Sequence, residues 1–348
     1  MTKTINARNV NEAFHIAMTM FNDYRNIDHG DILKQNSRNG EVLRFRSPTL
    51  IEYRKPDERV LFHPERDANP FFHFFESLWM LEGLETVSFL EFFNKRMIEY
   101  SDDGIRLNGA YGYRWRQRFK IDQIAQVIDI LRVNPDDRRA VIQMWDIFDL
   151  GIKSLDVPCN THIYFSIVEG KLNMTVCNRS NDMIWGALGA NVVHFSILQE
   201  YMASAIGVEL GSYFQFTNNL HVYTDLFNKL NNKINQSNLQ GFAHTEYEIG
   251  DMKPSPLVDN PDTFLKELNW FITHIDKMIS LGSWSEGLLT STWYENKVFY
   301  EVAGPMFIAW SHWKSKNIEG AIEYAKKIKA KDWNKTCVDW LERKKTNS

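Results

Sequence analysis

The side chains best suited to chemistry gather around one cysteine. Cys159 follows Pro158, and a polar run that contains Arg179, Ser180 and Asp182 comes later in the chain. A thiolate is a strong nucleophile, and a nearby cation favours this ionised form of a thiol. Proline restricts the residue before it to extended conformations, which helps to fix how the chain enters the cysteine. These residue types predict a nucleophilic Cys159 that Arg179 holds ionised.

Two runs of alternating apolar and polar residues predict the β-hairpin that brings these groups together. Residues 162–168 and 171–177 alternate in this way, and a two-residue turn with a glycine separates them. The register of this hairpin, carried along both strands, places Cys159 opposite Ser180 and next to Arg179. Cβ atoms of directly opposed residues lie about 4.5–5.5 Å apart. We therefore expect the thiol, the hydroxyl and the guanidinium to meet at the end of a sheet.

The alternative for Cys159 is a structural role. A free cysteine in a strand is more often a small buried hydrophobic residue than a nucleophile. The loop opposite this cysteine, however, is dense in charged and polar side chains, which cannot all be buried without partners. A reactive site is therefore the better hypothesis.

Several ordered motifs resemble those of the thymidylate synthase superfamily, which includes the pyrimidine nucleotide hydroxymethylases. The motifs are Pro158-Cys159, Arg179-Ser180-Asn181-Asp182, Trp185-Gly186, Asn191 and His221-Val222-Tyr223. Further matching segments run from about Arg38 to about Pro256, so the resemblance covers most of the chain. Ordered motifs at family-like spacing are a stronger signal than one short pattern. The resemblance implies an α+β fold with a large mixed β-sheet flanked by helices.

The resemblance also implies a reaction and its catalytic residues. In this superfamily a cysteine adds to C6 of a pyrimidine deoxynucleotide, and C5 then receives a one-carbon unit from methylene-tetrahydrofolate as co-substrate. Cys159 matches that nucleophile, and Arg179 matches the arginine that holds it ionised and contacts phosphate. Glu76 and Tyr111 match the proton-transfer network beside the base. Asp182 matches the residue that holds the folate pterin ring.

Three further arginines match phosphate-binding positions. Arg38 matches the phosphate-loop arginine, although its loop differs from the usual one, and a solvated turn arginine is the alternative. Arg138 and Arg139 match a pair that crosses the dimer interface to bind the partner's nucleotide, where a planar guanidinium suits phosphate. Adjacent arginines on a loop are otherwise a solvated charge run. The resemblance implies a homodimer with shared active sites.

Four residues match the positions that bind the base and the sugar. Asn191 matches the residue that reads the base edge, because an amide can complement both N3–H and the 4-oxo group of uracil. A flipped amide reads cytosine instead, which leaves dCMP open beside the favoured dUMP. His221 and Tyr223 match the pair that binds the 3′-hydroxyl, and Ser180 suits a deoxyribose. Without the resemblance, Tyr111 and a His-x-Tyr pair are ordinary packed residues.

The helix that carries Glu76 is predicted from its first residues. Asn69-Pro70 is typical of a helix start, because proline is favourable at the first helical position. The residues that follow are too apolar for a surface helix, so Glu76 is enclosed by apolar neighbours. A buried carboxylate must find partners or take up a proton. Glu82, at the end of the helix, is expected in solvent.

Periodic patterns place the other elements. Helices are expected over residues 11–24, with Asn11 as a cap, and over 121–133 and 191–206, and a strand over 140–145. Beyond about residue 281 the resemblance fades, and an apolar stripe predicts further helices. We expect a catalytic domain over residues 1–280 and a helical C-terminal extension over residues 281–348.

Composition excludes several classes of function. The net charge of −4 argues against a broad electrostatic surface for nucleic acid. Three cysteines without paired spacing form neither a disulfide framework nor a zinc motif, so no metal is expected and a reducing compartment fits. No apolar run approaches the length of a membrane span, and no signal core opens the chain. We expect a cytoplasmic enzyme.

Four departures from thymidylate synthases bear on the product. Asn160 follows the cysteine where those enzymes have histidine, and paired tryptophans are absent from residues 97–100. The loop 187–190 is one residue longer than usual, and the helical extension replaces the short terminal segment that closes over the folate. Hydride transfer to give a methyl group needs a dry, closed site, whereas water gives a hydroxymethyl group. The departures therefore favour a deoxynucleotide hydroxymethylase.

Two other functions remain open from the sequence. A thymidylate synthase, which makes dTMP from dUMP, differs only in the last step. A non-catalytic binding protein on the same fold is disfavoured, because Cys159, Glu76 and the matching arginines are all present.

Overall fold

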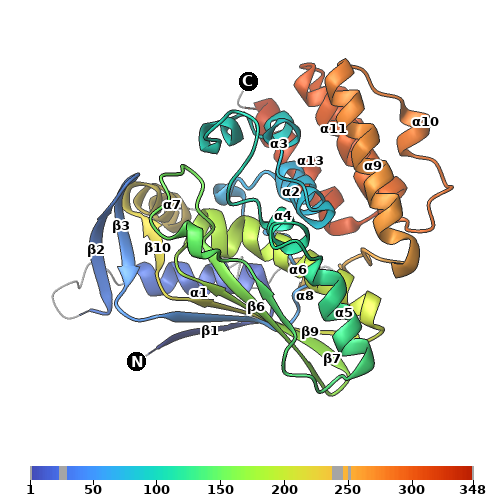
Figure 1. The fold of residues 1–348 in the computed structure, drawn as a ribbon. Coiled ribbons are helices and arrows are strands. Elements are labelled where there is room, and N and C mark those ends of the chain that lie inside the picture. Colours follow the sequence, from blue (N-terminus) through green and yellow to red (C-terminus); the bar gives the residue numbers. More distant parts are fainter. Residues whose placement is uncertain (1, 23–29, 237–245, 250–251, 347–348) are drawn as a thin grey trace.

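The computed structural model describes residues 2–22, 30–236, 246–249 and 252–346, and its strands form two sheets (Figure 1). The six-stranded sheet has the order β1-β4-β9-β7-β6-β5, and it is mixed because β1 runs parallel to β4 and β7 runs parallel to β9. The four-stranded sheet has the order β2-β3-β10-β8. The strands are β1 (Lys3–Ala7), β2 (Ile32–Ser37), β3 (Gly40–Phe45), β4 (Thr49–Tyr53), β5 (Val141–Gln143), β6 (Asn160–Val168), β7 (Lys171–Asn178), β8 (Asn181–Asp182), β9 (Glu209–Thr217) and β10 (Leu220–Tyr223).

The central hairpin has the predicted register for most of its length. Strands β6 and β7 pair from Val168–Lys171 to His162–Cys177, and the register then shifts so that Asn160 pairs with Asn178. This β-bulge gives β6 one extra residue. The expectation that Cys159 faces Ser180 is therefore wrong. The Arg179 N–H instead donates to the Cys159 carbonyl at 2.9 Å.

Helices cover one face of the six-stranded sheet, above its strands in the view of Figure 1. Alternate residues of β6 and β7, such as Ile163 and Val176, are fully buried on this face, whereas Tyr164 is 44% exposed on the other. The helices are α1 (Val10–Asn22), α2 (Pro70–Glu82), α3 (Val87–Phe93), α4 (Tyr111–Arg116), α5 (Gln123–Val133), α6 (Asn191–Ile206), α7 (Thr224–Gln236), α8 (Glu246–Ile249) and α9 (Pro261–Leu281). The predicted α+β class is confirmed.

Helix ends follow the expected capping rules, with two corrections. The Asn69 side chain accepts a hydrogen bond from Phe72 N–H at 3.1 Å, and α2 starts at Pro70 as predicted. Helix α1 is capped by Asn9 rather than Asn11, because the Asn9 side chain accepts from the first N–H groups. Glu82 is not simply solvated, since its Oε1 accepts a hydrogen bond from Asn269 Nδ2 at 2.7 Å.

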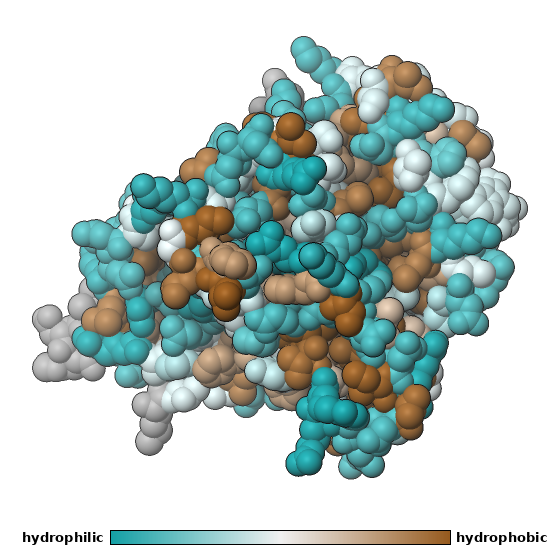
Figure 2. Space-filling model, in the orientation of Figure 1, coloured by the Kyte–Doolittle hydropathy of each residue, from teal (hydrophilic) through white to brown (hydrophobic). Residues whose placement is uncertain are grey.

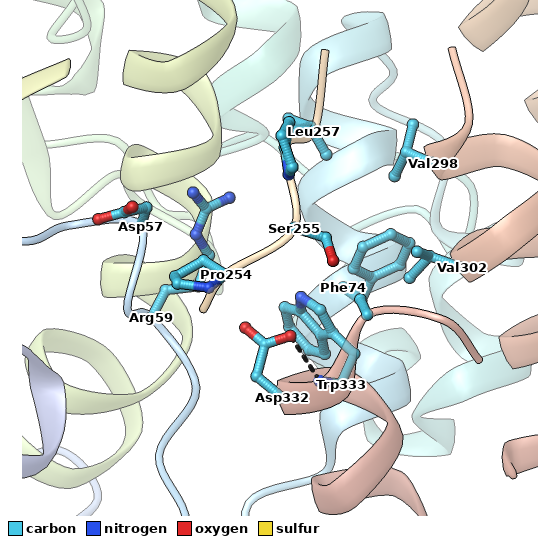
Figure 3. Close-up of a pocket in the computed structure, with 12 residues that line it drawn as sticks. Asp57, Arg59, Phe74, Pro254, Ser255, Leu257, Val298, Val302, Asp332 and Trp333 are labelled. Atoms are coloured by element: carbon cyan, nitrogen blue, oxygen red, sulfur yellow. Dashed lines mark hydrogen bonds between the residues drawn. The ribbon is translucent and has the colours of Figure 1, made fainter. Parts of the chain in front are cut away.

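The chain beyond residue 281 is helical, as predicted. It contains α10 (Glu286–Leu289), η7 (Val298–Ala303), α11 (Gly304–Lys314), α12 (Ile318–Ala325) and α13 (Lys331–Thr346). These helices pack on α2: the ring centroids of Phe74 and Trp333 lie 5.0 Å apart, and those of Phe71 and Trp310 lie 5.3 Å apart. Figure 3 shows Trp333 against Phe74, with Asp332 facing the segment that carries Arg59. The helix that carries Glu76 is thus braced by the extension. No described helix is long and apolar enough to cross a membrane.

Candidate active site

A cavity of about 280 Å³ lies between α2, α4, α6 and the turn that leads into β6. Cys159, Glu76, Tyr111, Asp182 and Asn191 all line it, so the structure brings together these five predicted residues. Asn181 and Trp185, which belong to motifs noted in the sequence without a role, also line it. Asp156, His194 and Trp79 line it as well, and the sequence analysis assigned them no place in the site.

Cys159 lies just before β6 and is partly exposed to the cavity. Burial raises the pKa of its thiol; the Arg179 charge opposes this rise, whereas Asp156 and Asp182 add to it. Arg179 thus favours the thiolate, but it offsets only part of the cost of burying that charge in the free protein. That Arg179 holds the thiol ionised during the reaction stays a prediction.

Arg179 holds the segment that precedes the nucleophile. Its Nε donates to the Pro158 carbonyl and its Nη2 to the Val157 carbonyl, both at 3.0 Å. The guanidinium also lies 5.6 Å from the ring centroid of Trp145. Arg38 reaches the same segment, because its Nη2 donates to the Leu155 carbonyl at 3.2 Å. Two cations thus lie beside the chain that delivers Cys159.

Glu76 has a buried histidine as its partner. The Oε2 atom of Glu76 lies 2.9 Å from Nε2 of His194, and both side chains are buried. His194 follows Asn191 on α6 with i, i+3 spacing, which places both on one face of that helix. That spacing was the signal available in the sequence, and it was missed.

Tyr111 begins α4, and its phenol faces the cavity beside the nucleophile. Burial raises its pKa well above the ordinary value, and the nearby Cys159 and Asp156 add to the rise. The phenol therefore keeps its proton and can donate a hydrogen bond to a ligand.

Asp156 adds a carboxyl group next to the thiol and the phenol. Its Oδ2 accepts a hydrogen bond from Gly109 N–H at 2.7 Å. The carboxyl packs so closely on Gly109 that a Cβ there would lie 2.6 Å from Oδ1. Burial raises the pKa of Asp156 to about 6. Its place just before Pro158-Cys159 was the available signal, because the chain that enters a nucleophile passes through the site.

Asp182 and Trp185 form another part of the cavity wall. The Oδ1 of Asp182 accepts a hydrogen bond from Trp185 N–H at 2.5 Å, whereas Oδ2 is buried without a hydrogen-bond partner among the described residues. Burial raises the pKa of Asp182. The Arg66 guanidinium lies 4.5 Å from the ring centroid of Trp185, which is 53% exposed. A half-exposed ring beside an unpaired carboxyl oxygen suits a flat ligand with N–H donors.

The remaining predicted residues lie outside the cavity lining. Ser180 Oγ and His221 Nδ1 are 3.5 Å apart, and His221 pairs with Asp182 across strands β10 and β8. The Tyr223 hydroxyl and Asn39 Nδ2 are also 3.5 Å apart, which places the end of β10 beside the β2–β3 turn. Ser180, His221 and Tyr223 thus lie between the cavity and the turn that carries Arg38.

A family model for thymidylate synthase matches residues 66–257. The chain belongs to the thymidylate synthase family. It is therefore a transferase of one-carbon groups, and enzymes of this family use methylene-tetrahydrofolate as a co-substrate with a nucleotide. The residues that the resemblance singled out in the cavity all fall within the matched segment.

Relatives with named activities fit the same family. The chain is 40% identical to a deoxyuridylate hydroxymethyltransferase of Pseudomonas phage M6 over 354 residues, which cover 99% of this chain and 95% of that protein. It is 40% identical over 211 residues to a protein of the same name from Bacillus phage SP01, covering 57% of this chain and 54% of that protein. A third, from Delftia phage PhiW-14, is 35% identical over 239 residues, covering 65% and 66%.

The two arginines expected to serve a partner subunit lie away from the cavity of their own chain. Arg138 and Arg139 are exposed in the turn between α5 and β5. Arg139 forms an ion pair with Asp137 at 2.6 Å, and its side chain is 82% exposed. Their position leaves the prediction of a shared thymidylate synthase-type site untested.

The four departures from thymidylate synthases now have structural counterparts. Asn160 is fully buried, and its side-chain amide donates a hydrogen bond to the side chain of Asn178. Met97 lines the cavity where paired tryptophans were expected. The longer loop forms a π-helical segment, Met183–Ala190, with non-helical backbone at Leu188 and Gly189, and such π-bulges often occur at functional sites. Among the described residues of the extension, none lines the cavity.

Proposed function

We propose that this chain transfers a one-carbon unit from methylene-tetrahydrofolate to C5 of dUMP and completes the reaction with water, giving the 5-hydroxymethyl nucleotide. The observation that carries the proposal is a single cavity in which a thiol meets several ionisable side chains: Cys159, Asp156, Glu76, Tyr111 and His194. A polar wall of this kind can hold and deprotonate water, whereas hydride transfer needs a dry site. The three named relatives support the same product.

The residues of this chain divide the work as follows. Cys159 Sγ gives up its proton and bonds to C6 of the pyrimidine, which makes C5 nucleophilic. Glu76, paired with His194, and Tyr111 move protons to and from the ring. C5 bonds to the one-carbon unit and then loses its proton, and the bond between that carbon and tetrahydrofolate breaks, so that tetrahydrofolate leaves and C5 carries an exocyclic methylene group. The oxygen of water bonds to that methylene carbon and gives up a proton. The thiolate then leaves C6, which restores the ring double bond, so the net step is redox-neutral.

The folate fits one side of the cavity. Bound methylene-tetrahydrofolate supplies the carbon that becomes attached to C5. The buried, unpaired Oδ2 of Asp182 suits the N–H donors of its pterin ring, and Trp185 offers a half-exposed face for stacking. No metal is proposed for this chemistry.

The phosphate and sugar extend toward the cations and hydroxyls outside the cavity. Arg38 and Arg179 lie beside the segment before Cys159, where they can meet a phosphate, and Ser180, His221 and Tyr223 can meet the deoxyribose. Arg138 and Arg139 would come from a second subunit. We propose a homodimer with shared sites in the cytoplasm, where the three cysteines stay free.

The bare face of the six-stranded sheet supports a homodimer. Tyr164 on β6 and Phe216 on β9 are 44% and 37% exposed there. Further apolar residues lie exposed in the segment after β5, among them Ile147, Phe148 and Leu150. Figure 2 shows separate apolar patches among hydrophilic side chains on the visible face. Exposed apolar surface of this kind often marks a protein interface.

Mass spectrometry of the products tests the proposal. The protein is incubated with dUMP or dCMP and methylene-tetrahydrofolate, with Cys159→Ala as the inactive control. We expect 5-hydroxymethyl-dUMP and free tetrahydrofolate. Formation of dTMP with dihydrofolate would instead establish a thymidylate synthase. Absence of any covalent or converted nucleotide would favour a binding protein.

A further inference from the structure

Three buried amide side chains form a relay that ends at the base-reading position. Gln215 Nε2 donates to the Ala187 carbonyl at 3.0 Å. Gln215 Oε1 accepts from Asn181 Nδ2 at 3.1 Å, and Asn181 Oδ1 accepts from Asn191 Nδ2 at 3.2 Å. Gln215 is 0% exposed, Asn181 3% and Asn191 7%. The relay joins β9, β8 and α6, and its last member lines the cavity.

The backbone carbonyl gives the relay its direction. A carbonyl only accepts hydrogen bonds, so Gln215 must turn its NH₂ group toward Ala187. The side-chain oxygen of Gln215 then faces Asn181, so Asn181 must donate a hydrogen bond to it from its own NH₂ group. The Asn181 oxygen is left to accept from Asn191. The order of O and N in an amide is otherwise ambiguous, but here each member fixes the next.

The relay leaves Asn191 with one fixed face toward the cavity. One N–H of its Nδ2 donates to Asn181, so Oδ1 and the second N–H of Asn191 remain for a ligand. Uracil offers an N–H at N3 and an acceptor at its 4-oxo group, which these two groups complement. Cytosine offers an acceptor at N3 and donors at its 4-amino group. The same pose would therefore set acceptor against acceptor and donor against donor.

Reading cytosine in that pose would require the Asn191 amide to flip. The flip either brings two buried oxygens together, on Asn191 and Asn181, or reverses all three amides and removes the Gln215 donor from Ala187. Each alternative leaves a buried polar group without its partner, which costs about tenfold or more in affinity. The relay thus fixes the orientation of the Asn191 amide, and this orientation favours uracil over cytosine.

We propose that Asn181 and Gln215 are specificity-determining residues, which position the amide of Asn191 so that the site accepts uracil and rejects cytosine. The inference rests on the proposed function, because it assigns the substrate of the same cavity. Gly186 fits this assignment: a Cβ there would lie 2.1 Å from Asn181 Oδ1, so a side chain would displace the middle of the relay.

Nucleotide binding and turnover of two glutamine variants test the relay. Gln215→Met removes the amide that donates to the Ala187 carbonyl, and it keeps the side chain at nearly the same size. Gln199→Met is the matched control, because Gln199 is equally buried and its Nε2 donates to three backbone carbonyls, of Leu172, Gly211 and Ser212. We measure Kd for dUMP and dCMP by calorimetry, and kcat/KM for both. The preference for dUMP should fall about tenfold in Gln215→Met and stay unchanged in Gln199→Met.

Two substitutions of Asn181 cover the case in which Gln215→Met fails to fold. Asn181→Asp keeps an acceptor toward Asn191 and should retain the preference for dUMP. Asn181→Leu removes that acceptor and should lose it. An unchanged preference in Asn181→Leu, or an equal loss in Gln199→Met and Gln215→Met, would overturn the inference.

The wild type separates this inference from the proposed function. Equal affinity for dUMP and dCMP would overturn the inference even if a hydroxymethyl product forms. Selective binding of dUMP followed by formation of dTMP would overturn the proposed function and leave the inference standing.

Discussion

Burial raises the pKa of both the nucleophile and the carboxyl group beside it. Burial in the free site therefore opposes ionisation of the thiol, and the carboxyl group ionises at a higher pH than usual. Functional sites often retain such unfavourable groups, and their replacement then stabilises the fold while it reduces activity. For Asp156 the test is the stability of a substituted protein. For Cys159 it is the pH dependence of the reactivity of the thiol.

Asp156→Asn should make the free protein more stable at neutral pH. The folded-state pKa of about 6 exceeds the ordinary value of 3.8, so the folded protein binds the proton more tightly than the unfolded chain. The protonated carboxyl group contributes its full stability below about pH 4, and this contribution is lost as the pH rises through 6. The free energy of unfolding then falls by about 3 kcal/mol. Denaturant unfolding at pH 5 and 7.5 should show a gain for Asp156→Asn that grows with pH. The exposed Asp136→Asn should show no such trend.

Alkylation of Cys159 by iodoacetamide should accelerate with pH up to pH 9 or beyond. The reactive species is the thiolate, and burial holds the pKa of this thiol above its ordinary value. Each pH unit should raise the rate about tenfold, as followed by mass spectrometry of the Cys159 peptide. A rate that is already constant at pH 7 would mean that Arg179 does ionise the thiol in the free protein.

Elements place these residues, and the sequence predicts elements better than it predicts contacts between them. Asn69-Pro70 located the start of α2, and alternation located the β6–β7 hairpin. The bulge before His162 escaped prediction, because it leaves the alternation of the strand intact. The rise in the pKa of the Cys159 thiol escaped prediction because the cost of desolvation depends on burial by distant segments. His194 and Gln215 likewise acquire their roles only through neighbours that are remote in the chain.

The contact between α2 and α4 predicts the effect of one methyl group. Gly112 lies so close to α2 that a Cβ would sit 1.8 Å from the Met80 carbonyl oxygen. Gly112→Ala must therefore push α4 away, at a cost of about 1–3 kcal/mol, and must carry Tyr111 with it. Turnover should fall more than about tenfold, since small displacements at a site are costly. In the control Gly287→Ala, the added Cβ meets no atom within 4 Å, so urea unfolding and turnover should match the wild type.

At the scale of the whole molecule, the extension supports the helix that carries Glu76, whereas the bare sheet face bears on association. The extension packs aromatic rings on the outer side of α2, which fixes the helix that carries Glu76. The sheet face opposite the helices carries exposed aromatic side chains, and it is the surface that we propose for the second subunit. An association through this face would complete a site that the single chain leaves without two of its expected arginines.

Subunit mixing tests whether the proposed homodimer shares its sites. Cys159→Ala should abolish turnover, and Arg138→Ala combined with Arg139→Ala should weaken it severely by removing phosphate contacts from the neighbouring subunit. Random mixing of the two proteins should restore about a quarter of wild-type activity, because half of the dimers are mixed and each has one site with both its cysteine and its arginines. Mixing Cys159→Ala with Arg96→Ala, a control at another exposed arginine, should recover about half, as expected from the intact cysteines alone. If the arginines act within their own chain, every site of a mixed dimer lacks either the thiol or the arginines. No activity would then return on mixing, and the shared site would be excluded.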